Sequence, residues 1–172
     1  MTGQSARFGG CAVSDAHLDC RPIDTDQALA EADGLCRIRR AKLTPLRRKA
    51  LALLLEQSRP VKAYDLLRQL REDGGAKPPT VYRALQFFVE MGLVHRIESL
   101  QAYTACSHWA HGHTAVFLIC DVCGSVAESA GGESANRLMK DAAGVKFTPT
   151  RAVIEVRGVC VACGSAKPEF KP

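Results

Sequence analysis

Two Cys-x-x-Cys pairs are the strongest chemical signal in the sequence. Their four cysteines are Cys120, Cys123, Cys160 and Cys163. Each pair turns the chain tightly enough to present both sulfurs to one ion, so two pairs supply the four thiolates of a tetrahedral zinc site. A glycine follows each pair directly, Gly124 and Gly164, and we expect both to adopt the positive φ that the turn needs. Because four sulfurs leave zinc no open position, the site is expected to hold structure and to do no catalysis.

Disulfides and a thioredoxin-like redox motif are the alternative uses of such pairs. The N-terminus does not resemble a signal peptide, and no βαβ pattern surrounds either pair, so both alternatives lack their usual context. The other cysteines lie in different settings. Cys11 and Cys20 lie in a segment without periodicity, and Cys36 lies in a helical pattern, where a thiol acts as a small apolar group. Only Cys106 lies among several histidines.

The charge of the chain is concentrated in its front half. The 172 residues have a net charge of +5 and contain no apolar run of about 18 residues that could span a bilayer. Residues 27–105 hold 14 Lys and Arg against 8 Asp and Glu, whereas residues 106–172 hold 7 against 6. We therefore expect a cytoplasmic protein whose front half binds a polyanion, although a solvated basic face is the commoner meaning of so small an excess.

Residues 25–105 have the pattern of a winged helix-turn-helix domain. Four helices are expected. The first begins after Thr25 or Asp26 and ends near Arg40, and the second runs from Pro45 to about Gln57. The third is Ala63–Glu72, and the fourth begins at the Lys77-Pro-Pro-Thr80 segment and is stopped by Gly92. Two short strands follow, Leu93–Glu98 and Ala102–Cys106. Residues 1–24 are poor in large apolar side chains, so we expect them to form a flexible leader.

The second expected helix has a clear start and an apolar face. Thr44 can cap the free amides of the first turn, and Pro45 fits the first helical position because no amide is needed there. The side chains expected to face inward are Leu46, Ala50, Leu53 and Leu54.

The fourth helix is the candidate reader of DNA. Its apolar residues Val81, Leu85 and Phe88 recur at helical spacing, which leaves a polar group near the N-terminal end. That group is Lys77, Thr80, Tyr82, Arg83 and Gln86. In a major groove an arginine can pair with guanine, a glutamine with adenine, and a tyrosine with the thymine methyl. Three-helix units with a hairpin also serve as protein-docking modules, and that remains the alternative.

Residues 106–172 are expected to form a small α+β dimerisation domain. Strands are predicted at Thr114–Cys120, Ser125–Glu128 and Arg151–Val159, and a helix at Glu133–Ala143. So short a segment builds only a thin core. We therefore expect both the zinc site and a dimer partner to stabilise it.

At the level of ordered motifs, the sequence resembles the ferric uptake regulator family over residues 26–165. The matching segments are Leu43-Thr44-Pro45-x-Arg47, Ala63-Tyr64-Asp65-Leu66-Leu67, Pro79-Thr80-Val81-Tyr82-Arg83-Ala84-Leu85, Gly92-Leu93-Val94-His95 and the two cysteine pairs. The resemblance is closest to the zinc-responsive branch. It implies a homodimeric repressor that binds AT-rich inverted repeats when a regulatory metal is bound, with Tyr64 and Arg83 as DNA contacts. Leu46 stands where the family usually has glutamine.

A second metal site is expected from four residues shared between the two domains. They are His95, Cys106, His113 and Glu128. One thiolate, two imidazoles and one carboxylate suit four-coordinate zinc, and the soft sulfur argues against iron or manganese. His108 or His111 can replace His113 in this set. With the four-cysteine site, the sequence therefore predicts two zinc ions per chain.

Zinc ligands of these types are used by metal-responsive repressors, by zinc hydrolases or deaminases, by redox sensors and by zinc-ribbon protein-docking modules. The leading hypothesis is a zinc-responsive repressor, and the alternative within the same family is a peroxide- or redox-responsive or iron-responsive repressor. A zinc deaminase needs a His-x-Glu segment before its Pro-Cys-x-x-Cys motif and an open zinc position, and the sequence has neither. We therefore expect no enzyme activity.

Overall fold

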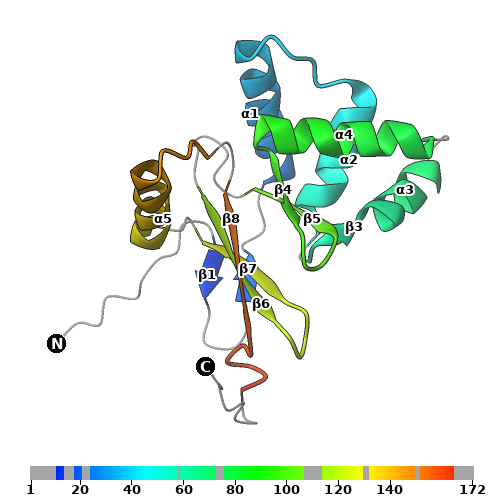
Figure 1. Cartoon of the computed structure of the whole chain (residues 1–172). Helices are drawn as coiled ribbons and strands as arrows, with labels where there is room; N and C mark the ends of the chain where they lie inside the picture. Colours follow the sequence, from blue (N-terminus) through cyan, green and yellow to red (C-terminus); the bar gives the residue numbers. More distant parts are fainter. Residues whose placement is uncertain are drawn as a thin grey trace. The chain divides into compact units, whose positions relative to one another are not determined.

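The computed structural model describes residues 11–13, 18–20, 24–57, 59–72, 76–106, 114–129, 132–149 and 152–164 (Figure 1). The chain divides into two compact units, one of Pro22–Trp109 and one of Met1–Arg21 with Ala110–Pro172. Both units combine helices with a small sheet, so the predicted α+β class is confirmed. In the described part of the chain, no helix has the length and apolarity to cross a membrane.

Helix α1, Thr25–Ile38, begins slightly earlier than the sequence predicted. The Asp24 carboxylate accepts hydrogen bonds from the backbone N–H groups of Asp26 at 3.1 Å and Gln27 at 3.3 Å. Asp24 is therefore the N-cap, because its side chain satisfies two amides that have no partner inside the helix.

Helix α2, Pro45–Leu55, has the predicted start and a different buried face. Thr44 Oγ accepts from the Arg47 N–H at 3.4 Å, which confirms the cap. The buried residues of this helix are Ala50, Leu51, Leu54 and Leu55. Leu46 and Leu53, which were predicted to face inward, pack only partly buried at the edge of the core. The run Ala50–Leu55 is apolar on every side, so its periodicity cannot define the buried face, and packing against the neighbouring helices selects it.

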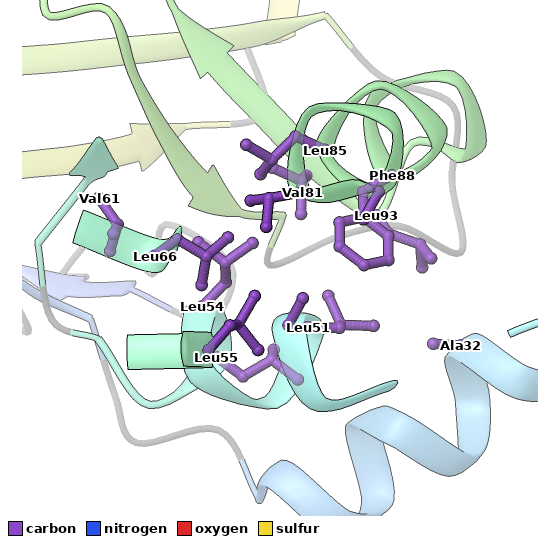
Figure 2. Close-up of a cluster of buried hydrophobic side chains, with 14 of the residues drawn as sticks. Ala32, Leu51, Leu54, Leu55, Val61, Leu66, Val81, Leu85, Phe88 and Leu93 are labelled. Atoms are coloured by element: carbon purple, nitrogen blue, oxygen red, sulfur yellow. The ribbon is translucent and has the colours of Figure 1, made fainter. Parts of the chain in front are cut away.

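Helices α3, Ala63–Glu72, and α4, Pro78–Met91, form the helix-turn-helix pair. Val81, Leu85 and Phe88 of α4 point toward the leucines of α2 in the common core (Figure 2). Gly92 ends α4 in the left-handed conformation with φ of 72°, which a glycine adopts without steric cost.

The wing is a three-stranded antiparallel sheet in the order β3-β5-β4. Strands β4, Val94–Ile97, and β5, Ala102–Ala105, form the predicted hairpin. Strand β3, Val61–Lys62, pairs with β5 and was not predicted. Two residues are too few for a period-2 pattern, so only the pairing partner reveals this strand.

The other unit contains a sheet in the order β7-β6-β8. Its elements are β6, Ala115–Cys120, β7, Val126–Ser129, α5, Gly132–Gly144, and β8, Val153–Gly158, all close to the predicted ranges. Strand β6 pairs with β7 antiparallel and with β8 parallel. The parallel register places Cys120 opposite Gly158, so β6 and β8 finish at the same end of the sheet.

The N-terminal segment contributes a short hairpin to this unit. Strands β1, Cys11–Val13, and β2, Leu18–Cys20, pair antiparallel and lie beside β7 (Figure 1). The sequence predicted no strand before Thr25. Three-residue strands are held by backbone pairing and need no hydrophobic pattern, so composition did not reveal them. Asp24, the last residue of the predicted leader, caps α1, and the remaining leader residues lie outside the described residues.

Candidate metal centres and nucleic-acid interface

The four predicted zinc ligands of the Cys-x-x-Cys pairs come together at one end of the β6–β8 sheet. Cys120 is the last residue of β6, and the Asp121 N–H donates to the Gly158 carbonyl at 2.8 Å, which extends the strand pairing to the first turn. The ligand atoms all lie within 4.8 Å of one another. They belong to Cys120, Cys123, Cys160 and Cys163. Parallel pairing of β6 with β8 thus brings together two cysteine pairs that are far apart in the sequence.

The first turn has the backbone that the sequence predicted. The Gly124 N–H donates to the Cys120 carbonyl at 3.0 Å, and the Cys120 N–H donates to the Ser125 carbonyl at 2.9 Å. Gly124 has φ of 70°, so a glycine is needed there for its conformational freedom.

The second turn uses its glycine for a different reason. The Cys163 N–H donates to the Cys160 carbonyl at 3.0 Å, and the Gly164 N–H donates to the Val161 carbonyl at 3.2 Å. Gly164 is not in the left-handed region, so the prediction of positive φ there is wrong. A Cβ atom at this position would lie 3.2 Å from the Cys160 carbonyl oxygen. Any larger residue at position 164 would have to displace the Cys160 carbonyl by a few tenths of an ångström, so the close approach of the backbone favours glycine there.

The sulfur geometry fits a metal ion and excludes disulfides among these cysteines. All four are free thiols, and the sulfurs of Cys123 and Cys160 are 3.8 Å apart. A disulfide needs about 2.05 Å between sulfurs. Four sulfurs at about 2.3 Å from a tetrahedral zinc lie about 3.8 Å from one another, which matches the observed separation.

The environment of the sulfurs favours thiolate at two of the four cysteines. Hydrogen bonds from the backbone N–H groups of Cys123 and Cys160 lower the pKa of Cys120 to about 6, and the Cys160 N–H lies 3.4 Å from its sulfur. The Ser125 hydroxyl, 3.1 Å from the Cys123 sulfur, lowers the pKa of Cys123. The hydrogen bond with the Cys160 side chain, burial and the neighbouring sulfurs raise the pKa of Cys163 to about 12. Neighbouring sulfurs cannot all be negatively charged at once without repelling one another, so some of them keep their protons. A bound dication would replace those protons and favour four thiolates.

One exposed ion pair joins the first cysteine turn to β8. Arg157 Nε donates to Asp121 Oδ1 at 2.8 Å, and Arg157 Nη2 approaches the same oxygen at 2.5 Å. Both side chains are about half exposed, so solvent screening limits the contribution of the pair to stability.

The second predicted metal set is distributed over both units. His95 on β4 and Cys106 just after β5 belong to the unit of residues 22–109, and their ligand atoms lie within 4.8 Å of each other. The Cys106 N–H donates to the Leu93 carbonyl at 3.0 Å, and Cys106 is only 1% exposed. Glu128 lies on β7 of the other unit, and it is buried, only 6% exposed. His113, with the alternatives His108 and His111, lies outside the described residues.

Helix α4 exposes the polar group predicted to contact DNA. Tyr82 is 56% exposed, and Arg83 and Gln86 are also exposed, with Gln86 Nε2 donating to Glu90 Oε1 at 2.9 Å. Lys77, the N-cap residue, and Thr80 are exposed at the start of the helix. Tyr64, at the start of α3, is 70% exposed. These side chains are thus available to a partner of the helix-turn-helix.

Two further arginines hold α4 in place and were not identified as functional from the sequence. The Arg47 guanidinium lies 3.6 Å from the centroid of the Phe87 ring, and its Nη1 donates to the Lys42 carbonyl at 2.8 Å. Arg39 Nη1 donates to the Met91 carbonyl at 3.2 Å, at the C-terminal end of α4. Arg47 belongs to one of the motifs that the sequence shares with a known family, so the sequence could have identified it. The Arg39 contact joins residues 52 positions apart, and no local pattern indicates it.

Comparison with known proteins supports the assignment of both units. A model of the ferric uptake regulator family matches residues 39–156. The zinc uptake regulation protein of Escherichia coli (strain K12) is 42% identical over 141 residues, which cover 81% of this chain and 82% of the relative. The protein of the same description from Shigella flexneri matches equally well.

Two solved structures resemble the chain closely. A zinc uptake regulator complexed with zinc and DNA has a TM-score of 0.76 and 41% identity, covering 82% of this chain and 95% of that chain. The structure of holo XcZur has a TM-score of 0.74 and 38% identity, covering 82% of this chain and 99% of that chain. By its motifs, its two units and these similarities, the chain belongs to the ferric uptake regulator family.

Proposed function

We propose that this chain is a zinc-responsive transcriptional repressor that binds operator DNA as a homodimer when a regulatory zinc site is filled. The observation that carries the proposal is a helix-turn-helix whose α4 exposes Tyr82, Arg83 and Gln86, in a chain that also holds four cysteine ligand atoms within 4.8 Å. The descriptions of the relatives, zinc uptake regulation proteins, support the choice of metal. As a DNA-binding repressor it would act in the cytoplasm.

The four-cysteine cluster would hold a structural zinc. Its donor set is closed, since four thiolates fill a tetrahedral ion and leave no position for water or substrate. The observed sulfur separation of 3.8 Å between Cys123 and Cys160 fits that arrangement. When bound, zinc would tie the end of β6 to the end of β8 and so stabilise the thin unit.

His95, Cys106, His113 and Glu128 would form the regulatory site. His95 and Cys106 are already close together at the wing, and the other two residues come from the segment that follows it. A zinc ion shared by both units would fix their relative orientation. Zinc and DNA would then favour the same arrangement of the units, and each would raise the affinity of the protein for the other.

The α4 helix would lie in the major groove of an AT-rich inverted repeat. Arg83 would pair with guanine or phosphate, Gln86 with adenine, and Tyr82 with a thymine methyl group. Lys77, Thr80 and Tyr64 would contact the DNA around the start of the helix. A two-fold related pair of such helices would read an inverted repeat, which is why the proposal needs a dimer.

The dimer would form on the outer face of the β6–β8 sheet. Leu118 and Val156 are partners in the parallel register and are 37% and 47% exposed, so they form an apolar patch on one face. Val122 and Val161, in the two cysteine turns, are more exposed still. Apolar surface of this kind on a thin unit is typical of a homodimer interface.

The test is a zinc titration with DNA. Operator DNA would be selected from random duplexes by the zinc-loaded protein, and affinity would be measured with zinc buffered by a competing chelator. We expect binding only above a threshold of free zinc, and the same binding after mild peroxide treatment with zinc present. Binding that iron restores and zinc does not, or that peroxide abolishes, would favour the iron- or redox-responsive alternative.

A further inference from the structure

Helix α3 carries an exposed hollow next to the proposed DNA reader. Its volume is about 290 Å³, and the described residues that line it are Tyr64, Leu67, Arg68 and Arg71. Tyr64, Arg68 and Arg71 recur at intervals of four and three residues, so they lie on one face of the helix. The stripe is about 10 Å long, at a rise of about 1.5 Å per residue.

The chemistry of the hollow suits a phosphate group. Two guanidinium groups and a phenol surround it, and guanidinium forks match the oxygens of phosphate better than any other side chain does. The Arg71 Nε donates to the Ala76 carbonyl at 3.4 Å, which uses one of its donors and joins the end of α3 to the segment before α4. The side chain of Arg68 is 65% exposed, so its charge is available to a partner.

One carboxylate opposes anion binding at this place. Asp65 Oδ1 lies 3.7 Å from Arg68 Nη2 on the same helix, and both side chains are exposed. An exposed pair of this kind is weak, so a phosphate with two negative oxygens can compete for the arginine. Asp65 would then reduce the affinity of the hollow without abolishing it.

We propose that Arg68 and Arg71, beside Tyr64, form a phosphate-binding site for the DNA backbone at the edge of the groove that α4 enters. In a helix-turn-helix the first helix crosses the backbone while the second reads bases, and α3 is the first helix here. Phosphate contacts fix register and affinity and carry no sequence information. The proposal rests on the proposed function, since it needs a chain that binds DNA.

The test uses the full-length zinc-loaded protein, an operator duplex and a scrambled duplex of equal length. Arg68→Ala and Arg71→Ala should each weaken binding to both duplexes by the same factor. Each should also reduce the slope of log affinity against log salt by about 2, because the homodimer loses one arginine from each protomer. Asp65→Asn should tighten binding to both duplexes. The matched control is Arg137→Ala on α5, which removes the same charge from an exposed arginine of the other unit and should leave the slope unchanged.

Arg68→Ala alone decides the proposal, because Arg71 also supports the Ala76 backbone and its loss can lower the melting temperature. An unchanged salt slope for Arg68→Ala would overturn it. A loss limited to the operator would instead make Arg68 a base reader. Weaker binding with an unchanged slope and reduced cooperativity would assign the hollow to a protein partner. If the wild type itself shows no zinc-dependent DNA binding, the proposed function fails, and that result is separate from all of these.

Discussion

The two units differ in how much core they contain. Of the twelve largest fully buried side chains among the described residues, eleven belong to the unit of Pro22–Trp109 and one, Phe117, belongs to the other unit. The helix-turn-helix unit therefore has the buried apolar surface to fold by itself. The β6–β8 unit has little core, four clustered cysteines and an exposed apolar patch at Leu118 and Val156. Zinc binding and dimerisation are expected to provide the stability of this unit, as side-chain packing does in the helix-turn-helix unit.

The largest expected effect is the loss of a ligand of the four-cysteine site. Cys120→Ser or Cys163→Ser should abolish cooperative unfolding of the β6–β8 unit and prevent dimerisation, because structural zinc contributes about 10–16 kcal/mol of apparent binding energy in small zinc-held domains. Calorimetry, metal analysis and sedimentation would measure the outcome. Cys36→Ala, which removes a buried thiol from the other unit, should keep both zinc and dimer. If the Cys120→Ser protein formed a dimer as stable as the wild type, the β6–β8 unit would not depend on zinc for its stability.

The reciprocal experiment removes a buried side chain from the helix-turn-helix unit. Phe88 is fully buried in α4, and Phe88→Ala should cost about 3–5 kcal/mol of the free energy of unfolding of the helix-turn-helix unit. Zinc in the four-cysteine site should remain bound, since its ligands belong to the other unit. Metal content measured together with a thermal melt would show this. Release of that zinc on melting of the first unit would mean that the two units depend on each other for stability.

A third change should separate signalling from stability. Cys106→Ser removes a ligand of the proposed regulatory site, and we expect a folded dimer with one zinc per chain that no longer responds to zinc. A 100-fold effect of zinc on DNA affinity corresponds to about 2.7 kcal/mol of coupling, and operator DNA must tighten zinc binding by the same factor. Zinc titrations with and without operator would test both directions. Equal zinc-dependent DNA binding by wild type and Cys106→Ser would exclude the regulatory site.

The smallest change concerns the surface of the stable unit. Arg83→Ala should cost about 1–3 kcal/mol of binding energy per half-site and relax discrimination at one base pair of each half-site if Arg83 reads a base. It should leave thermal stability unchanged, because Arg83 is exposed. Arg37→Ala is a suitable control, since Arg37 is exposed and paired with Asp33 within α1. Equal weakening on operator and scrambled DNA would make Arg83 a phosphate contact.

The elements with local chemical signals were predicted from the sequence. Thr44, Pro45 and Gly92 mark helix ends through their own side chains or backbone freedom, and the structure confirms each. The polar face of α4 follows from helical spacing alone. Each Cys-x-x-Cys turn was also predicted, because a pair carries its turn within four residues, whereas the pairing of β6 with β8 brings the two pairs into one cluster.

Features that depend on distant partners were decided only by the tertiary structure. Leu51 and Leu55 replace Leu46 and Leu53 in the core because neighbouring helices choose one face of an all-apolar run. The two-residue strand β3 exists because β5 lies beside it, and the short β1–β2 hairpin is likewise defined by pairing. Glycine is favoured at position 164 because the Cys160 carbonyl passes close to it, a contact that the local sequence does not reveal. In each case the role of a residue depends on a contact with another part of the chain. Its own neighbours in the sequence do not determine that contact, which forms only when the chain folds.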